Sequence, residues 1–200
     1  MFDVGLRRAI DPALNRVATR VAKTGISANA ITAIGALLGI AAGAALTSHH
    51  YHLALAFVIA NRMADGLDGA VARIDGPSLW GGYLDAIADY IFYIAVPVGF
   101  GLAEPDNVLS ALVLVASFTL TAVSFLAYAA IAAKADLADE PHGPKAFLYS
   151  TGLIEGGETV AFFIAMCIFP AYFTPFAIGF TSLCILTVAQ RIWIARSTLV

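Results

Sequence analysis

Long apolar segments separated by short polar ones occupy most of this chain. Each segment approaches the 20 or so residues that a helix needs to cross the hydrocarbon core of a bilayer, so each predicts a transmembrane helix. We expect about six such helices, over residues 30–48, 52–73, 79–102, 107–133, 148–170 and 174–195. The pattern therefore predicts an all-α integral membrane protein.

The first 26 residues have a different pattern, in which apolar and basic positions alternate at helical spacing. Asp11 and Pro12 suit the N-cap and the first turn of a helix. The apolar positions that follow are Leu14, Val17 and Val21, and the basic ones are Arg16, Arg20 and Lys23. We expect an amphipathic interfacial helix in residues 1–26 and a six-helix membrane bundle in residues 27–196, together one domain over residues 1–200. A helix that docks on a soluble partner is the alternative.

Composition agrees with a membrane protein. Hydrophobic residues make up 60% of the 200 positions and charged ones 12%, with a mean hydropathy of +0.84, which is too apolar for a soluble domain. Lys and Arg precede the first span, follow the second, and lie between the fourth and fifth and at the end of the last. The turns at 49–52, 104–106 and 170–174 contain neither. The positive-inside rule then predicts a multi-pass protein of the cell membrane with both termini in the cytoplasm.

Four aspartates lie within the second and third predicted spans, where charged groups are costly and are functional by default. Asp65 and Asp68 are three residues apart, and Asp85 and Asp89 four apart, so each pair shares one helix face. If the two faces meet, the carboxylates need a cation to remain ionised together. Hard divalent ions prefer such oxygen ligands, so we expect one or two Mg²⁺ or Mn²⁺ ions.

Small and basic residues accompany these acids. Gly66 and Gly69 flank Asp68, and their lack of a side chain lets a bulky ligand approach the helix, although close helix packing is the alternative. Arg73 ends the second span, where its guanidinium suits a phosphate. Arg62 lies well inside the span and is expected to neutralise part of the acid cluster.

The run Asp65-x-x-Asp68-Gly69-x-x-Ala72-Arg73, then Gly81, then Asp85-x-x-x-Asp89, resembles the signature of the CDP-alcohol phosphotransferases. These are membrane enzymes that make phospholipids. The interval between Arg73 and Gly81 is one residue shorter than in the family's pattern, and it falls in the expected turn. Upstream, the run from Ser27 to Thr32 resembles the Thr-Pro-Asn-x-x-Thr sequence that often precedes the family's first span, with Ala28 in place of the proline.

The resemblance implies transfer of a phosphatidyl group from a CDP-alcohol, with CDP-diacylglycerol expected as donor, to a small alcohol acceptor, releasing CMP. It implies two metal ions, a homodimer in the lipid bilayer and no nucleic-acid partner. Asp89 would be the general base and a further metal ligand. The expected metal ligands are Asp65, Asp68, Asp85 and Asp89, and the expected nucleotide-binding residues are Asn29, Thr32, Gly66, Asp68, Gly69, Ala72 and Arg73.

The acceptor is open at this stage. Glycerol 3-phosphate is favoured by analogy with the family, and inositol phosphate or serine are the alternatives. A phosphorylated acceptor needs basic residues such as Lys145 or Arg191, whereas an amine suits Glu155 and Glu158. Two other classes compete: a transporter with a carboxylate-lined cation path, and a prenyltransferase with paired aspartate motifs, which needs more spans than this chain offers.

Overall fold

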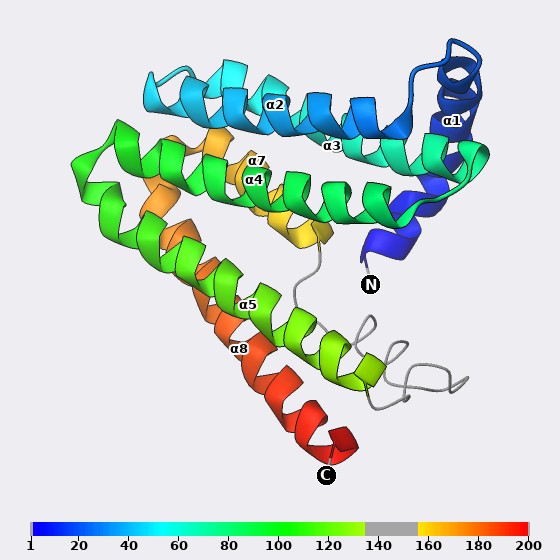
Figure 1. Cartoon of the computed structure of the whole chain (residues 1–200). Coiled ribbons are helices and arrows are strands. Elements are labelled where there is room, and N and C mark those ends of the chain that lie inside the picture. The colour runs from blue at the N-terminus through cyan, green and yellow to red at the C-terminus, as the bar shows by residue number, and fades with distance from the viewer. Residues whose placement is uncertain (1, 135–155, 200) are drawn as a thin grey trace.

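The computed structural model describes residues 2–134 and 156–199, and within these ranges every regular element is helical (Figure 1). The helices in chain order are α1 (Phe2–Ala22), α2 (Ala28–Thr47), α3 (Tyr51–Asp75), α4 (Leu79–Ala103), η1 (Pro105–Asn107), α5 (Val108–Lys134), α7 (Gly156–Ile168), η3 (Pro170–Tyr172) and α8 (Phe173–Leu199). The all-helical membrane fold predicted from the sequence is confirmed.

Four helices of the described part are long and apolar enough to cross a membrane: α2, α4, α5 with its preceding turn, and α8 with its preceding turn. Helix α3 has 25 residues, which is long enough to cross a membrane, but it contains the charged residues Arg62, Asp65 and Asp68. Helix α7 is a shorter apolar helix, and the predicted span over 148–170 begins outside the described residues. The other predicted spans begin within two residues of the observed helices. The count of six is thus not established.

Helices α2, α3 and α4 run side by side, and the pair α5 and α8 crosses beneath them (Figure 1). Glycines allow α2 and α4 to touch through their backbones. A Cβ added at Gly43 would lie 2.5 Å from the carbonyl oxygen of Ala95, and one at Gly99 would lie 2.5 Å from the carbonyl oxygen of Gly43. This close approach is near the C-terminal ends of α2 and α4, and α2 packs against both α3 and α4.

The largest buried cluster includes residues of α2 to α5, α7 and α8, and its aromatic rings join α4 and α5 to α7 and α8. The Phe163 ring on α7 meets Phe92 edge-on at 5.4 Å between centroids and Phe118 at 6.1 Å. Phe100 stacks on Phe173 at 4.5 Å. Each such aromatic pair contributes about 0.5–1.5 kcal/mol to stability beyond the burial of its apolar area. These contacts therefore hold α4 and α5 against α7 and α8.

A hydrogen-bond network connects the helices at the end of the bundle where α4 is followed by α5 and where α8 begins. The Asn107 side chain donates to the Phe100 carbonyl at 3.5 Å and accepts from the Thr174 hydroxyl at 3.1 Å, and Ser110 lies 3.0 Å from Thr174. The turns between α2 and α3, α4 and α5, and α7 and α8 all lie at this end, away from both termini (Figure 1).

Helix α1 corrects one prediction. It begins at Phe2 and continues through Pro12, so Asp11 is not its N-cap. The capping preference of Asp11 is local, and it loses its effect because the residues before it are helical as well. The apolar face of α1 packs within the chain: Ala18 is fully buried beside Ala64 and Val71 of α3, with Leu14 at the edge of the cluster.

Candidate active site

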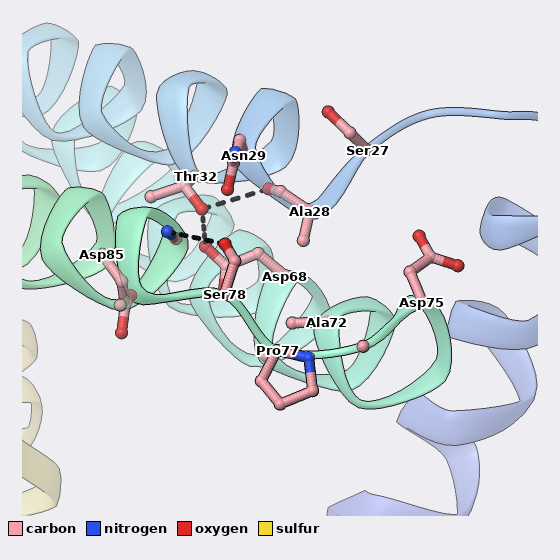
Figure 2. A pocket seen from close by; sticks show the side chains of 14 residues that line it. Ser27, Ala28, Asn29, Thr32, Asp68, Ala72, Asp75, Pro77, Ser78 and Asp85 are labelled. Atoms are coloured by element: carbon pink, nitrogen blue, oxygen red, sulfur yellow. Dashed lines mark hydrogen bonds between the residues drawn. The ribbon is translucent and has the colours of Figure 1, made fainter.

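A cavity of ≈ 290 Å³ opens where α2 and α4 begin and α3 ends (Figure 2). It contains many residues of the two predicted motifs. The lining residues are Ser27, Ala28, Asn29, Thr32, Asp68, Gly69, Ala72, Asp75, Gly76, Pro77, Ser78, Gly81, Gly82 and Asp85. Segments 36 or more residues apart in sequence therefore form one site.

Two capped helix N-termini face this cavity. The Ser27 hydroxyl accepts from the Ala30 backbone N–H at 3.3 Å at the start of α2, and the Ser78 hydroxyl accepts from the Gly81 N–H at 3.0 Å at the start of α4. Remaining free N–H groups and the helix dipole make such ends favourable for an anion. A Cβ at Gly81 would lie 3.1 Å from Oδ1 of Asn29, so this glycine lets α4 approach α2. The cavity thus combines anion-binding helix ends with carboxylates.

Asp68 is the most constrained acid of the cluster. Its side chain is 5% exposed, and its Oδ2 accepts a hydrogen bond of 2.6 Å from the Thr32 hydroxyl, which also donates to the Ala28 carbonyl at 3.1 Å (Figure 2). The contact joins α2 to α3 at the floor of the cavity. Thr32 and Asp68 come from the two separate motifs, so the fold brings those motifs together.

A second, smaller cavity adjoins the first and is lined by all four aspartates. Asp65, Asp68, Asp85 and Asp89 share it with Thr32, Gly35, Asn61, Arg62 and Ala88. Carboxylate oxygens are the donors that Mg²⁺ and Mn²⁺ prefer, so the donor set fits a hard divalent ion. Within the described ranges, no three His, Cys, Asp or Glu side chains are already grouped closely enough to hold one. An ion would therefore draw the carboxylates closer together.

Arg62 lies between two of these acids. Its Nη2 donates to Oδ1 of Asp89 at 2.9 Å, and its Nη1 is 3.5 Å from Oδ2 of Asp65. Its Nε donates to the Asn61 side-chain oxygen at 2.7 Å, and its guanidinium carbon lies 4.3 Å from the centre of the Phe92 ring. The contact with acids expected from the sequence is thus present, and the guanidinium is fixed on several sides.

Some predicted nucleotide-binding residues lie elsewhere. A Cβ at Gly66 would lie 3.2 Å from a methyl group of Leu14, so this glycine faces α1 and permits its packing. Arg73 is exposed and does not line either cavity, although its Nη1 lies 3.6 Å from where a Cβ of Gly69 would be. Their roles toward a nucleotide stay predictions.

The predicted acceptor residues are divided. Lys145 and Glu155 lie outside the described residues. Glu158 is in the first turn of α7, two residues after Gly156, whose added Cβ would lie 3.6 Å from the Tyr93 hydroxyl. Arg191, on α8, donates to the Thr121 carbonyl at 2.9 Å and to the Ser124 hydroxyl at 3.3 Å. Neither Glu158 nor Arg191 lines the two cavities.

Sequence reasoning did not identify Asn61, Asp75 or Ser78 as site residues. Asn61 is 2% exposed and donates to the Gly35 carbonyl at 2.7 Å. An amide inside an apolar span, next to an arginine, was the available signal for it. Ser78, placed after a proline and before an apolar run, has the pattern of an N-cap.

Comparison with known proteins agrees with this geometry. The family model for CDP-alcohol phosphatidyltransferases matches residues 25–193. The chain belongs to the CDP-alcohol phosphatidyltransferase family. Its reaction class is thus phosphatidyl transfer from a CDP-alcohol in phospholipid synthesis, in a family that depends on divalent metal ions. The transporter and prenyltransferase alternatives find no support in the match.

Two relatives extend the comparison. The inner membrane protein YnjF of Escherichia coli (strain K12) is 40% identical over 200 residues, which covers 100% of this chain and 97% of the relative. The fold is similar to that of the phosphatidylinositol phosphate synthase PgsA1 of Mycobacterium tuberculosis, crystallised with manganese and citrate. That structure matches with a TM-score of 0.73 at 18% identity, over 92% of this chain and 90% of its own. The inner membrane relative and the apolar helices support a multi-pass protein of the cell membrane.

Proposed function

We propose that this protein transfers the phosphatidyl group of CDP-diacylglycerol to a small phosphorylated alcohol, with glycerol 3-phosphate as the first candidate, and releases CMP. The supporting observation is the cavity in which Thr32, Asp68 and Asp85 lie beside the N-termini of α2 and α4. Such a site suits a diphosphate, because the helix ends favour its negative charge and the carboxylates can share a metal ion with it.

The residues divide the reaction between them. Asp65, Asp68 and Asp85 would hold one or two Mg²⁺ or Mn²⁺ ions, which when bound neutralise charge on the diphosphate and on the departing CMP. Asn29, Gly69, Ala72 and Gly81 shape the nucleotide side of the cavity. Asp89 would accept the proton of the acceptor hydroxyl as its oxygen bonds to the phosphorus that carries diacylglycerol. The bond from that phosphorus to the oxygen bridging the two phosphates breaks, and this oxygen leaves with CMP.

Arg191 supports a phosphorylated acceptor. Its Nε is buried and has no hydrogen-bond partner among the residues that the structure describes. An unpaired buried donor on a cation is costly, and a phosphate would satisfy it. Glu155 and Glu158 would instead favour an amine acceptor such as serine, and inositol phosphate is the second phosphorylated candidate.

The test uses the purified full-length protein in phospholipid nanodiscs with CDP-diacylglycerol, Mn²⁺ and one acceptor at a time. We expect CMP release with glycerol 3-phosphate, and a KM for that acceptor raised about tenfold or more in Arg191→Ala, because a charge-assisted hydrogen bond is lost. Glu158→Gln should leave this KM unchanged or lower it. CMP release with serine alone, with a KM that rises in Glu158→Gln, would replace the phosphorylated acceptor with an amine.

A further inference from the structure

Asn61 and Arg62 form a continuous chain of hydrogen bonds across three helices. The Asn61 amide donates to the Gly35 carbonyl of α2 and accepts from Nε of Arg62, and Nη2 of Arg62 donates to Asp89 of α4. The three bonds are 2.7, 2.7 and 2.9 Å long. Asn61 and Arg62 are neighbours on α3, so these three bonds connect Asp89 of α4 to the backbone of α2.

Aromatic rings near the Arg62 guanidinium and the burial of its side chain also restrict its position. Its central carbon lies 4.3 Å from the Phe92 ring centre and 5.8 Å from that of Tyr93, and the Arg62 side chain is only 17% exposed. Phe92 itself is fully buried against Phe163 of α7. Stacking of this kind orients a planar cation, which a lysine in the same place could not reproduce.

Arg62 binds only one oxygen of Asp89. The contact is to Oδ1, so Arg62 does not itself bind Oδ2. The Asp89 side chain is 31% exposed. Asp68 instead accepts a hydrogen bond of 2.6 Å from the Thr32 hydroxyl of α2. The acids therefore differ in their partners: Asp89 accepts a hydrogen bond from Arg62 at 2.9 Å, whereas Asp65 is an ion-pair partner of Arg62 at 3.5 Å.

We propose that Asn61 and Arg62 act as a positioning unit for Asp89 and as a resident counter-cation of the aspartate cluster. Arg62 fixes the rotamer in which Oδ2 of Asp89 faces the acceptor hydroxyl, and Asn61 fixes Arg62. The positive charge of Arg62 also offsets part of the repulsion among the acids before any ion binds. The positioning role rests on the proposed function of Asp89; the counter-cation role does not.

The two roles predict opposite effects on catalysis and on metal binding. Arg62→Gln should lower kcat about 100-fold with a nearly unchanged KM for CDP-diacylglycerol, because positioning acts on the transition state. The same variant should bind Mn²⁺ about three- to tenfold more tightly, because a repelling charge is gone. A merely structural arginine would instead weaken both. Arg62→Lys keeps the charge without the planar fork, so its Mn²⁺ affinity should stay near that of the wild type while kcat remains reduced.

Two further variants isolate the connection to Asp89. Asn61→Leu should lower kcat and leave Mn²⁺ affinity unchanged, because Arg62 keeps its charge but loses its support. If Arg62 acts through Asp89, the double variant Arg62→Gln/Asp89→Asn should be no slower than Asp89→Asn alone, since the effects are not additive. Arg20→Gln, an exposed arginine on α1, is the matched control and should match the wild type in each assay.

The experiment measures Mn²⁺ binding by electron paramagnetic resonance, CMP release and thermal unfolding on the same purified proteins. A kcat in Arg62→Gln within about twofold of the wild type, or fully additive losses in the double variant, would overturn the positioning role. Unchanged or weaker Mn²⁺ binding in Arg62→Gln would overturn the counter-cation role. If the wild-type protein releases no CMP with any acceptor, the proposed function fails, and the Mn²⁺ titrations still decide the counter-cation role.

Discussion

At the scale of single residues, the four aspartates share a cavity but have different environments. Asp68 is buried and bonded to Thr32, Asp65 and Asp89 flank Arg62, and Asp85 is exposed at the junction of the two cavities. Equivalent positions in a sequence motif therefore need not have equivalent roles. We therefore expect metal binding and proton transfer to fall to different members of the cluster.

Removing a metal ligand should affect binding and turnover together. We expect Asp65→Asn, Asp68→Asn and Asp85→Asn each to weaken Mn²⁺ binding at least about tenfold and to abolish most CMP release, because an amide is a poorer ligand than a carboxylate. Isothermal titration with Mn²⁺ and a CMP assay measure the two effects. The prediction is wrong if all three variants keep wild-type activity in a metal-free buffer.

Asp89 should behave differently from these ligands. If it is the general base, Asp89→Asn should lower kcat about 100- to 10,000-fold while the affinity for CDP-diacylglycerol stays nearly constant, because a base acts in the transition state. Equilibrium binding of the donor to Asp89→Asn, compared with its kcat, makes the distinction. A parallel loss of donor and Mn²⁺ binding would identify Asp89 as a metal ligand instead.

At the scale of helices, small residues determine how α2 and α4 meet. Gly43 and Gly99 leave no room for a Cβ against the facing helix and Gly39 leaves little, whereas Gly179 on α8 has open space around it. Glycine therefore permits close helix packing in α2 and α4, whereas Gly179 in α8 makes no such contact. Nearer the cavity, Gly81 lets α4 approach Asn29 of α2, and both helices contribute their N-terminal ends to the cavity.

Gly43→Ala tests the close packing of α2 and α4. The new methyl group would lie 2.5 Å from the Ala95 carbonyl oxygen, so the helices must separate. We expect a loss of about 1–3 kcal/mol in the free energy of unfolding, measured by denaturant titration in detergent micelles. Gly179→Ala is the matched control and should be neutral or slightly stabilising, because alanine is the better helix former. Equal stabilities of the two variants would contradict the packing argument.

At the scale of the whole molecule, the bundle has two chemically different ends. The turns at residues 48–50, 104–107 and 169–172 contain no Lys or Arg, and the opposite end has the termini (Figure 1) and the cavity. The basic residues would face the cytoplasm, where a soluble nucleotide product can leave. The homodimer expected from the family resemblance stays a prediction.

Membrane orientation can be tested with single cysteines. In a variant whose buried Cys167 and Cys184 are replaced by alanine, Asp106→Cys should react with a membrane-impermeant maleimide in intact cells. Ser197→Cys, near the C-terminus, should react only after the cells are permeabilised. The measurement is labelling of the purified protein from each sample. The reverse labelling pattern would show that the termini face outward.

The helices and the placement of the acids on helix faces could be predicted from local sequence patterns. Hydropathy and helical spacing are local properties, so the starts of five of the six predicted spans agree with the structure to within two residues. The interval between Arg73 and Gly81, which is one residue shorter than in the family's pattern, includes the turn at Gly76 to Ser78. The spacing of the signature within each helix is therefore kept. The family signature could be read for the same reason, because it lies in two adjacent helices.

Which helix faces meet depends on how the separate helices pack. Thr32 and Asp68 are 36 residues apart and Arg62 and Asp89 are 27 apart, and each contact depends on how closely two helices approach. The same holds for Gly66, which the motif suggested for a nucleotide and the fold places against Leu14 of α1. Spacing along one helix fixes a side chain's direction relative to its neighbours in that helix. The partner it reaches depends on the packing of separate helices, which no local pattern specifies.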